Sequence, residues 1–117
     1  MPNYMIADLA AIPAVKCPCG FARRAFATPD NQTATLHLVD THEDSRTHYH
    51  KRMTELYLVL EGEGQIELDG KLHPLIPMTA IFIKPLVIFQ FWLPSVSSRC
   101  PMMSVGLART SEGMAAR

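Results

Sequence analysis

Residues 48–70, HYHKRMTELYLVLEGEGQIELDG, decide the fold of this chain. Within them, two short apolar stretches, Glu55–Leu60 and Gln65–Leu68, are separated by a turn that contains two glycines. In Gln65–Leu68 apolar and polar residues alternate, which is typical of a strand with one buried face. Asp69-Gly70 follows, and this dipeptide favours a type I′ hairpin turn, whose two central residues both need a positive φ. The segment therefore predicts antiparallel strands joined by tight turns.

Further short apolar stretches lie on both sides of this segment, and prolines and glycines separate them. The other strands that we expect are Arg23–Ala27, Thr33–Val39, Lys71–Leu75, Ala80–Ile83, Val87–Leu93 and Met103–Ala108. The first fifteen residues predict either a strand or one short helix. Short strands at regular spacing, with turn signals between them, predict an all-β barrel or sandwich.

Composition excludes several classes of protein. The chain has 117 residues, which suits one domain, and its 11 basic residues equal its 11 acidic residues, so it lacks the basic excess of a nucleic-acid binder. Its apolar runs are shorter than the roughly 20 residues that span a bilayer. Three cysteines do not make a disulfide framework, and the N-terminal residues have no basic region of a secretory signal. We therefore expect a cytoplasmic protein with no membrane or nucleic-acid partner.

A possible metal site begins at His48-Tyr49-His50. Residues i and i+2 of a strand point to the same face, so both imidazoles would point one way. Polar residues 51–54 would turn the chain, and Glu55 would then bring a carboxylate back toward the two rings. Two imidazoles and one carboxylate are typical ligands of a divalent iron, manganese, nickel or zinc ion. A His-x-His pair alone also occurs by chance, so the argument depends on the wider pattern.

That wider pattern closely resembles the first motif of the cupin superfamily: His48-x-His50, four residues, Glu55, six residues and Gly62. Residues 33–85 are similar to the core of a small single-domain cupin. In this interpretation the whole chain, residues 1–117, is one domain. Residues 1–32 would form N-terminal strands or an arm, and residues 86–117 would form an atypical C-terminal segment.

The resemblance implies an antiparallel jelly-roll barrel, also called a double-stranded β-helix, that forms a homodimer. It implies a divalent metal ion in the barrel mouth, with His48, His50 and Glu55 as ligands. The second cupin motif normally supplies a fourth ligand, a histidine, but no histidine follows His73 in this chain. Phe89 stands near the position where that histidine is expected, so the second motif is degenerate and the metal would be weakly bound.

The same motif departs from the family pattern at its turns. Met78 and Thr79 replace its usual Gly-Asp, and Leu86 replaces its turn glycine. The uncharged stretch LVIFQFWLPSVSS, residues 86–98, has two interpretations. It is either a buried strand or dimer face, or a stretch whose family pattern a change of reading frame has removed.

Several other residues are candidates for binding. Tyr57 follows Glu55 by two residues and so shares its strand face, and His37 would lie on an inward face of its strand; both are predicted substrate contacts. His73 is predicted at the surface. Arg23 and Arg24 would contact an anionic ligand or form a solvated face. Cys17-Pro18-Cys19-Gly20 predicts a tight turn, since two thiolates do not complete a zinc site.

Two functions remain open from the sequence. The first is a metal-dependent enzyme that acts on a small polar molecule, with no catalytic residue assigned. The second is a non-enzymatic or inactive barrel that binds a small molecule and has lost its fourth metal ligand. A fold does not by itself fix chemistry, so the sequence does not decide between them.

Overall fold

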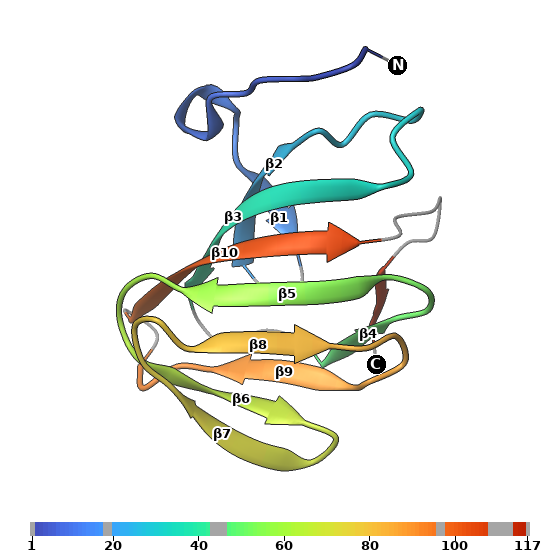
Figure 1. Ribbon diagram of the computed structural model, residues 1–117. Helices are drawn as coiled ribbons and strands as arrows, with labels where there is room; N and C mark the ends of the chain where they lie inside the picture. Colours follow the sequence, from blue (N-terminus) through green and yellow to red (C-terminus); the bar gives the residue numbers. More distant parts are fainter. Residues whose placement is uncertain (1, 18–19, 43–46, 96–97, 108–113, 117) are drawn as a thin grey trace.

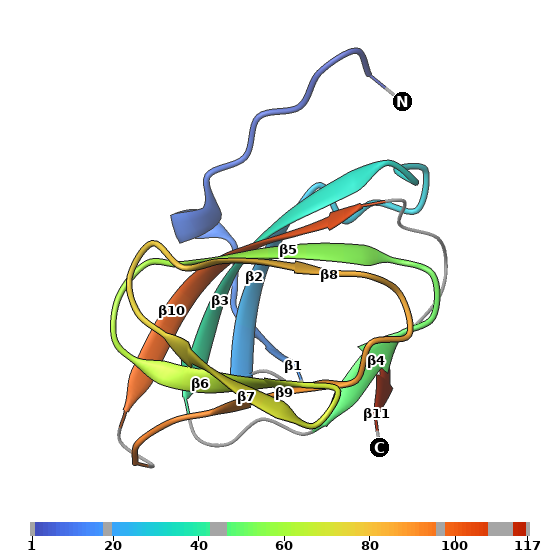
Figure 2. The same cartoon turned by 60° about the horizontal axis from the view of Figure 1, so that its bottom comes forward.

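The computed structural model describes residues 2–17, 20–42, 47–95, 98–107 and 114–116. It consists of two antiparallel sheets that curve around a common interior (Figures 1 and 2). The six-stranded sheet has the order β1-β2-β3-β10-β5-β8 and the five-stranded sheet has the order β11-β4-β9-β6-β7. The strands are β1 Val15–Cys17, β2 Gly20–Ala25, β3 Ala34–His42, β4 His48–His50, β5 Thr54–Val59, β6 Gly64–Leu68, β7 Lys71–Leu75, β8 Ala80–Ile83, β9 Phe89–Trp92, β10 Arg99–Leu107 and β11 Met114–Ala116. The all-β antiparallel jelly-roll predicted from the sequence is confirmed.

The hairpin between β6 and β7 has the predicted turn. Leu68 pairs with Lys71, and the two residues between them, Asp69 and Gly70, have φ angles of 47° and 85°. Positive φ at both central positions defines a type I′ turn, whose twist matches that of the flanking strands. The alternation in β6 is also confirmed, because Ile66 is buried against the core while its neighbour Gln65 is exposed.

Two strands of the six-stranded sheet have other boundaries than the sequence predicted. The strand predicted at Met103–Ala108 begins earlier, at Arg99, because β10 pairs with β3 through Pro101 and up to Arg99 opposite His42. Proline was interpreted as a break, but here it lies inside a strand. The strand predicted at Arg23–Ala27 is Gly20–Ala25, since Phe26 takes a φ of 66° and ends it.

The first fifteen residues contain a short helix, which is one of the two alternatives that the sequence left open, and a strand begins at the last of them. One turn of 3₁₀ helix spans Leu9–Ala11, and Asp8 caps it by accepting a hydrogen bond from the Ala10 amide at 3.0 Å. The short strand β1 then forms a hairpin with β2. Among the described residues, no helix is long and apolar enough to cross a membrane.

The C-terminal segment that looked atypical in sequence contributes strands to both sheets. β9 pairs with β4 and β6 in one sheet, and β10 lies between β3 and β5 in the other (Figure 1). Phe89 and Phe91 of β9 are buried, and every second residue of β10 is buried from Cys100 to Gly106. As far as Leu107, the segment therefore has the alternating pattern of a barrel strand.

Candidate functional site

The register of the six-stranded sheet arranges its inward side chains in rows that run across the strands. One row is apolar and consists of Ala22, Val39, Met102 and Val59. Two residues further along, the second row consists of Arg24, His37, Ser104, Tyr57 and Ile81. The third row consists of Thr35, Gly106, Glu55 and Ile83. One end of the barrel interior is therefore closed by apolar packing, and the polar side chains gather next to it.

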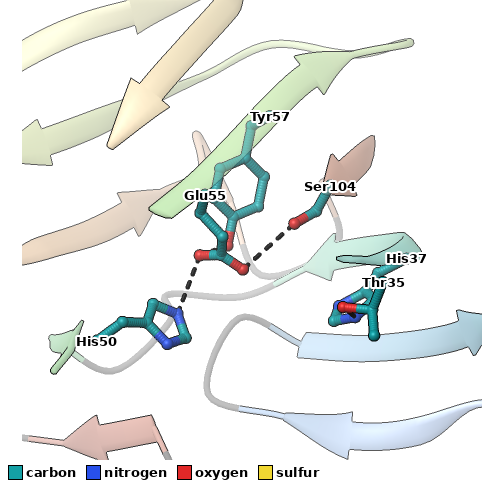
Figure 3. Close-up of polar contacts among 6 residues, drawn as sticks. All are labelled: Thr35, His37, His50, Glu55, Tyr57 and Ser104. Carbon is teal, nitrogen blue, oxygen red and sulfur yellow. Dashed lines mark hydrogen bonds and ion pairs between the residues drawn. The ribbon is translucent and has the colours of Figure 1, made fainter. Parts of the chain in front are cut away.

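Glu55 is the centre of this polar region. It is only 2% exposed, yet its carboxylate has three close neighbours (Figure 3). Tyr57 donates its hydroxyl to Oε2 at 3.0 Å, and Ser104 donates its hydroxyl to Oε1 at 3.3 Å. His50 brings its Nε2 to within 3.0 Å of Oε2. These contacts offset the cost of burying a carboxylate, which is large for a group without partners.

The same contacts decide the ionisation of Glu55. Burial by itself raises the pKa of this carboxyl. The close contact and charge of His50, together with the Tyr57 hydroxyl, favour the charged form more strongly, so the pKa lies below its ordinary value. Glu55 is therefore a carboxylate at neutral pH.

His50 comes from β4 in the opposite sheet, and the β4–β5 turn brings it to Glu55. The sequence predicted a turn over residues 51–54; residues 51–53 form it, and Thr54 already belongs to β5. The Nε2 atom of His50 is buried and has no hydrogen-bond partner, although it lies 3.0 Å from the Glu55 carboxylate. The site thus places a buried imidazole nitrogen that lacks a well-aligned hydrogen bond next to a buried carboxylate.

His48 lies deeper and has a different environment. It is fully buried on the same face of β4, and the centre of its ring is 6.1 Å from that of His50. Phe89 stands directly opposite it on β9, with the two rings only 4.1 Å apart. Among the residues that the structure describes, no three His, Cys, Asp or Glu side chains gather as a metal centre would require. The structure therefore brings His50 and Glu55 together and leaves His48 beside them.

The donors of His50 and Glu55 nevertheless suit a metal ion. Two ligands at right angles around an ion, each about 2.1 Å from it, lie about 3 Å apart. The Nε2 atom of His50 and the Oε2 atom of Glu55 are 3.0 Å apart, and Nε2 has no competing hydrogen bond. An imidazole nitrogen and a carboxylate oxygen are also a donor set that divalent iron, manganese, nickel or zinc accepts. The fit is good for two donors, and His48 would have to reorient to become the third.

The two predicted substrate contacts both lie on the inner face. Tyr57 is buried between Glu55 and Phe91, whose ring is 5.2 Å away. His37 is half-buried on β3, directly opposite Ser104, and its Nε2 lies 2.9 Å from the Thr35 hydroxyl (Figure 3). Their role in binding a substrate stays a prediction.

The remaining candidates lie outside this cluster. His73 is exposed on β7, as predicted. Arg23 donates hydrogen bonds to the carbonyl groups of Ala10 and Ile12 and so ties the N-terminal residues to β2. Cys17 pairs with Gly20 in the β1–β2 hairpin, and residues 18 and 19 of the predicted tight turn lie outside the described residues.

Ser104 and Thr35 belong to the site, but sequence reasoning did not identify them. Both are fully buried polar residues on central strands, and Gly106 lies between Thr35 and Glu55 in the third row. The sequence feature that points to them is the alternation in β10: every second residue faces inward, and these residues are Cys100, Met102, Ser104 and Gly106. Small and polar residues on an otherwise apolar inward face indicate a site, but this pattern is visible only once the strand boundaries are known.

The chain is similar to several solved structures. No protein-family model matches the chain, and no curated protein matches it. Among solved structures, a protein from Planctomyces limnophilus is 32% identical over 95% of this chain and 92% of its own, with a TM-score of 0.81. A cupin protein from Bacteroides fragilis is 20% identical over 97% of this chain and 91% of its own, with a TM-score of 0.69. The polyketide cyclase RemF from Streptomyces resistomycificus is 20% identical over 97% of this chain and 84% of its own, with a TM-score of 0.76.

Proposed function

The chain has the fold of the cupin proteins, and we propose that its barrel binds a small polar molecule beside a weakly held divalent metal ion. The binding site would be the polar end of the interior, where Glu55, His50, Ser104 and Tyr57 meet. Cupin-fold proteins include both enzymes and binding proteins, and the polyketide cyclase named above is one such enzyme. The proposal therefore rests on the site of this chain and not on its fold.

One observation carries the proposal. The buried Nε2 atom of His50 has no hydrogen bond and faces the ionised carboxylate of Glu55 at 3.0 Å. A buried polar atom without a partner costs about 1–3 kcal/mol, and a bound ion is one explanation for such an atom in a native protein. A cation between Nε2 and the carboxylate would remove this cost.

His50 and Glu55 would hold the ion, and His48 would join them after its ring turns away from Phe89. When bound, a divalent ion supplies Lewis acidity, which polarises an oxygen atom of a bound molecule. The protein itself supplies the orientation of the site. Tyr57 and Ser104 hold the two carboxylate oxygens of Glu55 from fixed positions on β5 and β10. A ligating carboxylate held in this way keeps its direction and its charge.

Metal analysis tests the proposal. Protein dialysed against Mn²⁺, Ni²⁺ or Zn²⁺ should retain less than one ion per chain, and a chelator should remove it without unfolding the barrel. His50→Ala should abolish the retained metal. His73→Ala is the matched control, because His73 is exposed on β7, and it should leave the metal content unchanged. Equal metal content in both variants would contradict the proposal.

A second candidate function is a binding module that uses no metal. The packing of Phe89 against His48 favours it, because an aromatic ring fills the place beside that imidazole. In this case the polar cluster would bind its molecule through hydrogen bonds alone. Stabilisation of the chelated protein by a small-molecule panel, equal to that of the metal-loaded protein, would favour this candidate over the first.

A further inference from the structure

We propose that the small molecule carries an anionic group, which Arg24 binds next to His37 at the end of the second inward row. This inference rests on the proposed function, since it names the class of molecule that the same site would accept. Carboxylate and phosphate groups share the required chemistry, because both offer two oxygen atoms to the planar guanidinium of arginine.

The register of β2 and β3 places Arg24 on the inner face. Arg24 is the direct partner of His37, and His37 is the direct partner of Ser104, which donates to Glu55. Residues directly opposite in an antiparallel pair lie on the same face, with their Cβ atoms about 4.5–5.5 Å apart. Arg24 is therefore two strands away from Ser104 in one continuous row of polar side chains.

The inward-facing positions of β2 change from buried to exposed at this residue. Ala22, two residues before Arg24 on the same face of β2, is 2% exposed, whereas Arg24 itself is exposed. The chain just beyond Arg24 is fixed by Asn31, which donates to the carbonyl groups of Phe26 and Ala34, both at 2.8 Å. Arg24 is thus an exposed side chain at the end of the polar row, and the chain that follows it is well anchored.

The two adjacent arginines of β2 differ in their partners. Arg23 points to the other face and donates to two backbone carbonyl groups of the N-terminal residues. In the part of the chain that the structure describes, Arg24 forms no hydrogen bond or ion pair. A structural role accounts for Arg23, but no contact with the described residues accounts for Arg24.

The charges on the inner face also favour an anion. Among the strand residues that the structure describes, Glu55 is the single acidic residue on that face, and its oxygens are already in contact with Tyr57, Ser104 and His50. Asp40, on the outer face of β3, pairs with Arg99. Among the residues that the structure describes, Arg24 therefore has no acidic partner, and a ligand anion would provide one.

The experiment is an NMR titration of the ¹⁵N-labelled protein with inorganic phosphate or malonate, compared with chloride at the same ionic strength. We expect saturable shifts at the Arg24 side-chain Nε–H and at the backbone amides of Arg24 and His37. Arg24→Gln should weaken anion binding at least tenfold, and Arg24→Lys should recover part of the affinity. The control Lys71→Gln, at the distant β6–β7 turn, should change the affinity less than twofold.

The outcomes separate this inference from the proposed function, because metal content is measured in the same Arg24→Gln sample. Loss of anion binding with unchanged metal content supports an anion subsite at Arg24. Unchanged anion binding in Arg24→Gln, or no saturable shift in the parent protein, overturns the inference and leaves the metal proposal standing. A response to malonate but not to phosphate, or the reverse, would identify which anion the site accepts.

Discussion

Phe89 stands directly opposite His48 across the β4–β9 pair, and the centres of the two rings are 4.1 Å apart. Phe89 also lies 6.1 Å from the ring of His50 and is 1% exposed. It is therefore the side chain on β9 that closes the space next to both histidines. The sequence suggested this residue as the place of the absent fourth ligand, and the register puts it on the same face as the proposed ligands.

Phe89→His should raise the affinity for Zn²⁺ or Ni²⁺ at least tenfold, because a third imidazole would face the proposed ligands as a fourth donor. Removing a packed phenylalanine costs about 3–5 kcal/mol, so the free energy of unfolding must be measured in parallel. Phe91→His is the matched control, because Phe91 is equally buried on the same strand but pairs with Ile66 instead of His48. An equal gain of affinity in both variants, or none in a folded Phe89→His protein, would contradict this placement of the second motif.

Acid should release the metal through the histidines rather than through Glu55. The pKa of Glu55 lies below its ordinary value, so this carboxylate stays charged when the pH falls from 8 to 5. An imidazole has a reference pKa of about 6.5 and must be neutral to bind a metal. Metal content after equilibrium dialysis should therefore fall steadily across this range. If elemental analysis finds constant metal down to pH 5, the ligands are not His48 and His50.

Local sequence signals predicted the parts of the fold that depend on neighbouring residues. Asp69-Gly70 has the positive φ angles that its turn type requires, and His48-x-His50 points both rings to one face because a strand has a period of two. These features depend on a few adjacent residues, so the sequence alone defines them.

The features that depend on distant pairing could not be predicted in this way. Ser104 meets Glu55 across 49 positions of sequence, and it does so only because β10 lies between β3 and β5. No local pattern indicates which strands become neighbours. The sequence alone therefore predicted neither this contact nor the pairing of Arg24 with His37. The proline inside β10 further concealed the length of that strand.

Met78→Gly and Leu86→Gly should each stabilise the protein by about 1 kcal/mol, because both residues have a φ of 72°. Glycine adopts such angles without steric strain. The side chains contribute little, since Met78 is 76% exposed and Leu86 is 65% exposed. The Leu86 amide donates to the His50 carbonyl at 2.7 Å, so the turn at Leu86 also supports the site strand.

Alanine at the same two positions provides the control for this prediction. Alanine removes the exposed side chain but keeps the Cβ atom that causes the strain, so Met78→Ala and Leu86→Ala should not be stabilised. Chemical denaturation measures all four variants. Equal stability of the glycine and alanine variants would show that neither turn is strained.

Gly62 and Gly70 form a matched pair that separates backbone strain from crowding. Their φ angles are similar, 79° and 85°. Backbone strain at alanine should therefore lower the free energy of unfolding by about 1–2 kcal/mol at either position. Their surroundings differ, because a Cβ atom at Gly62 would lie 2.3 Å from the carbonyl oxygen of Arg99, whereas nothing lies within 4 Å of one at Gly70.

Gly62→Ala should therefore destabilise the protein by about 2–5 kcal/mol and Gly70→Ala by only about 1–2 kcal/mol. The Arg99 backbone cannot move aside easily, since it pairs with His42 at the start of β10, and the nearby Leu60 amide donates to the Pro101 carbonyl at 2.9 Å. Urea denaturation of the two variants gives the comparison. If both lose the same stability, the close approach of the β5–β6 turn to β10 is wrong; if Gly70→Ala loses nothing, the type I′ turn is wrong.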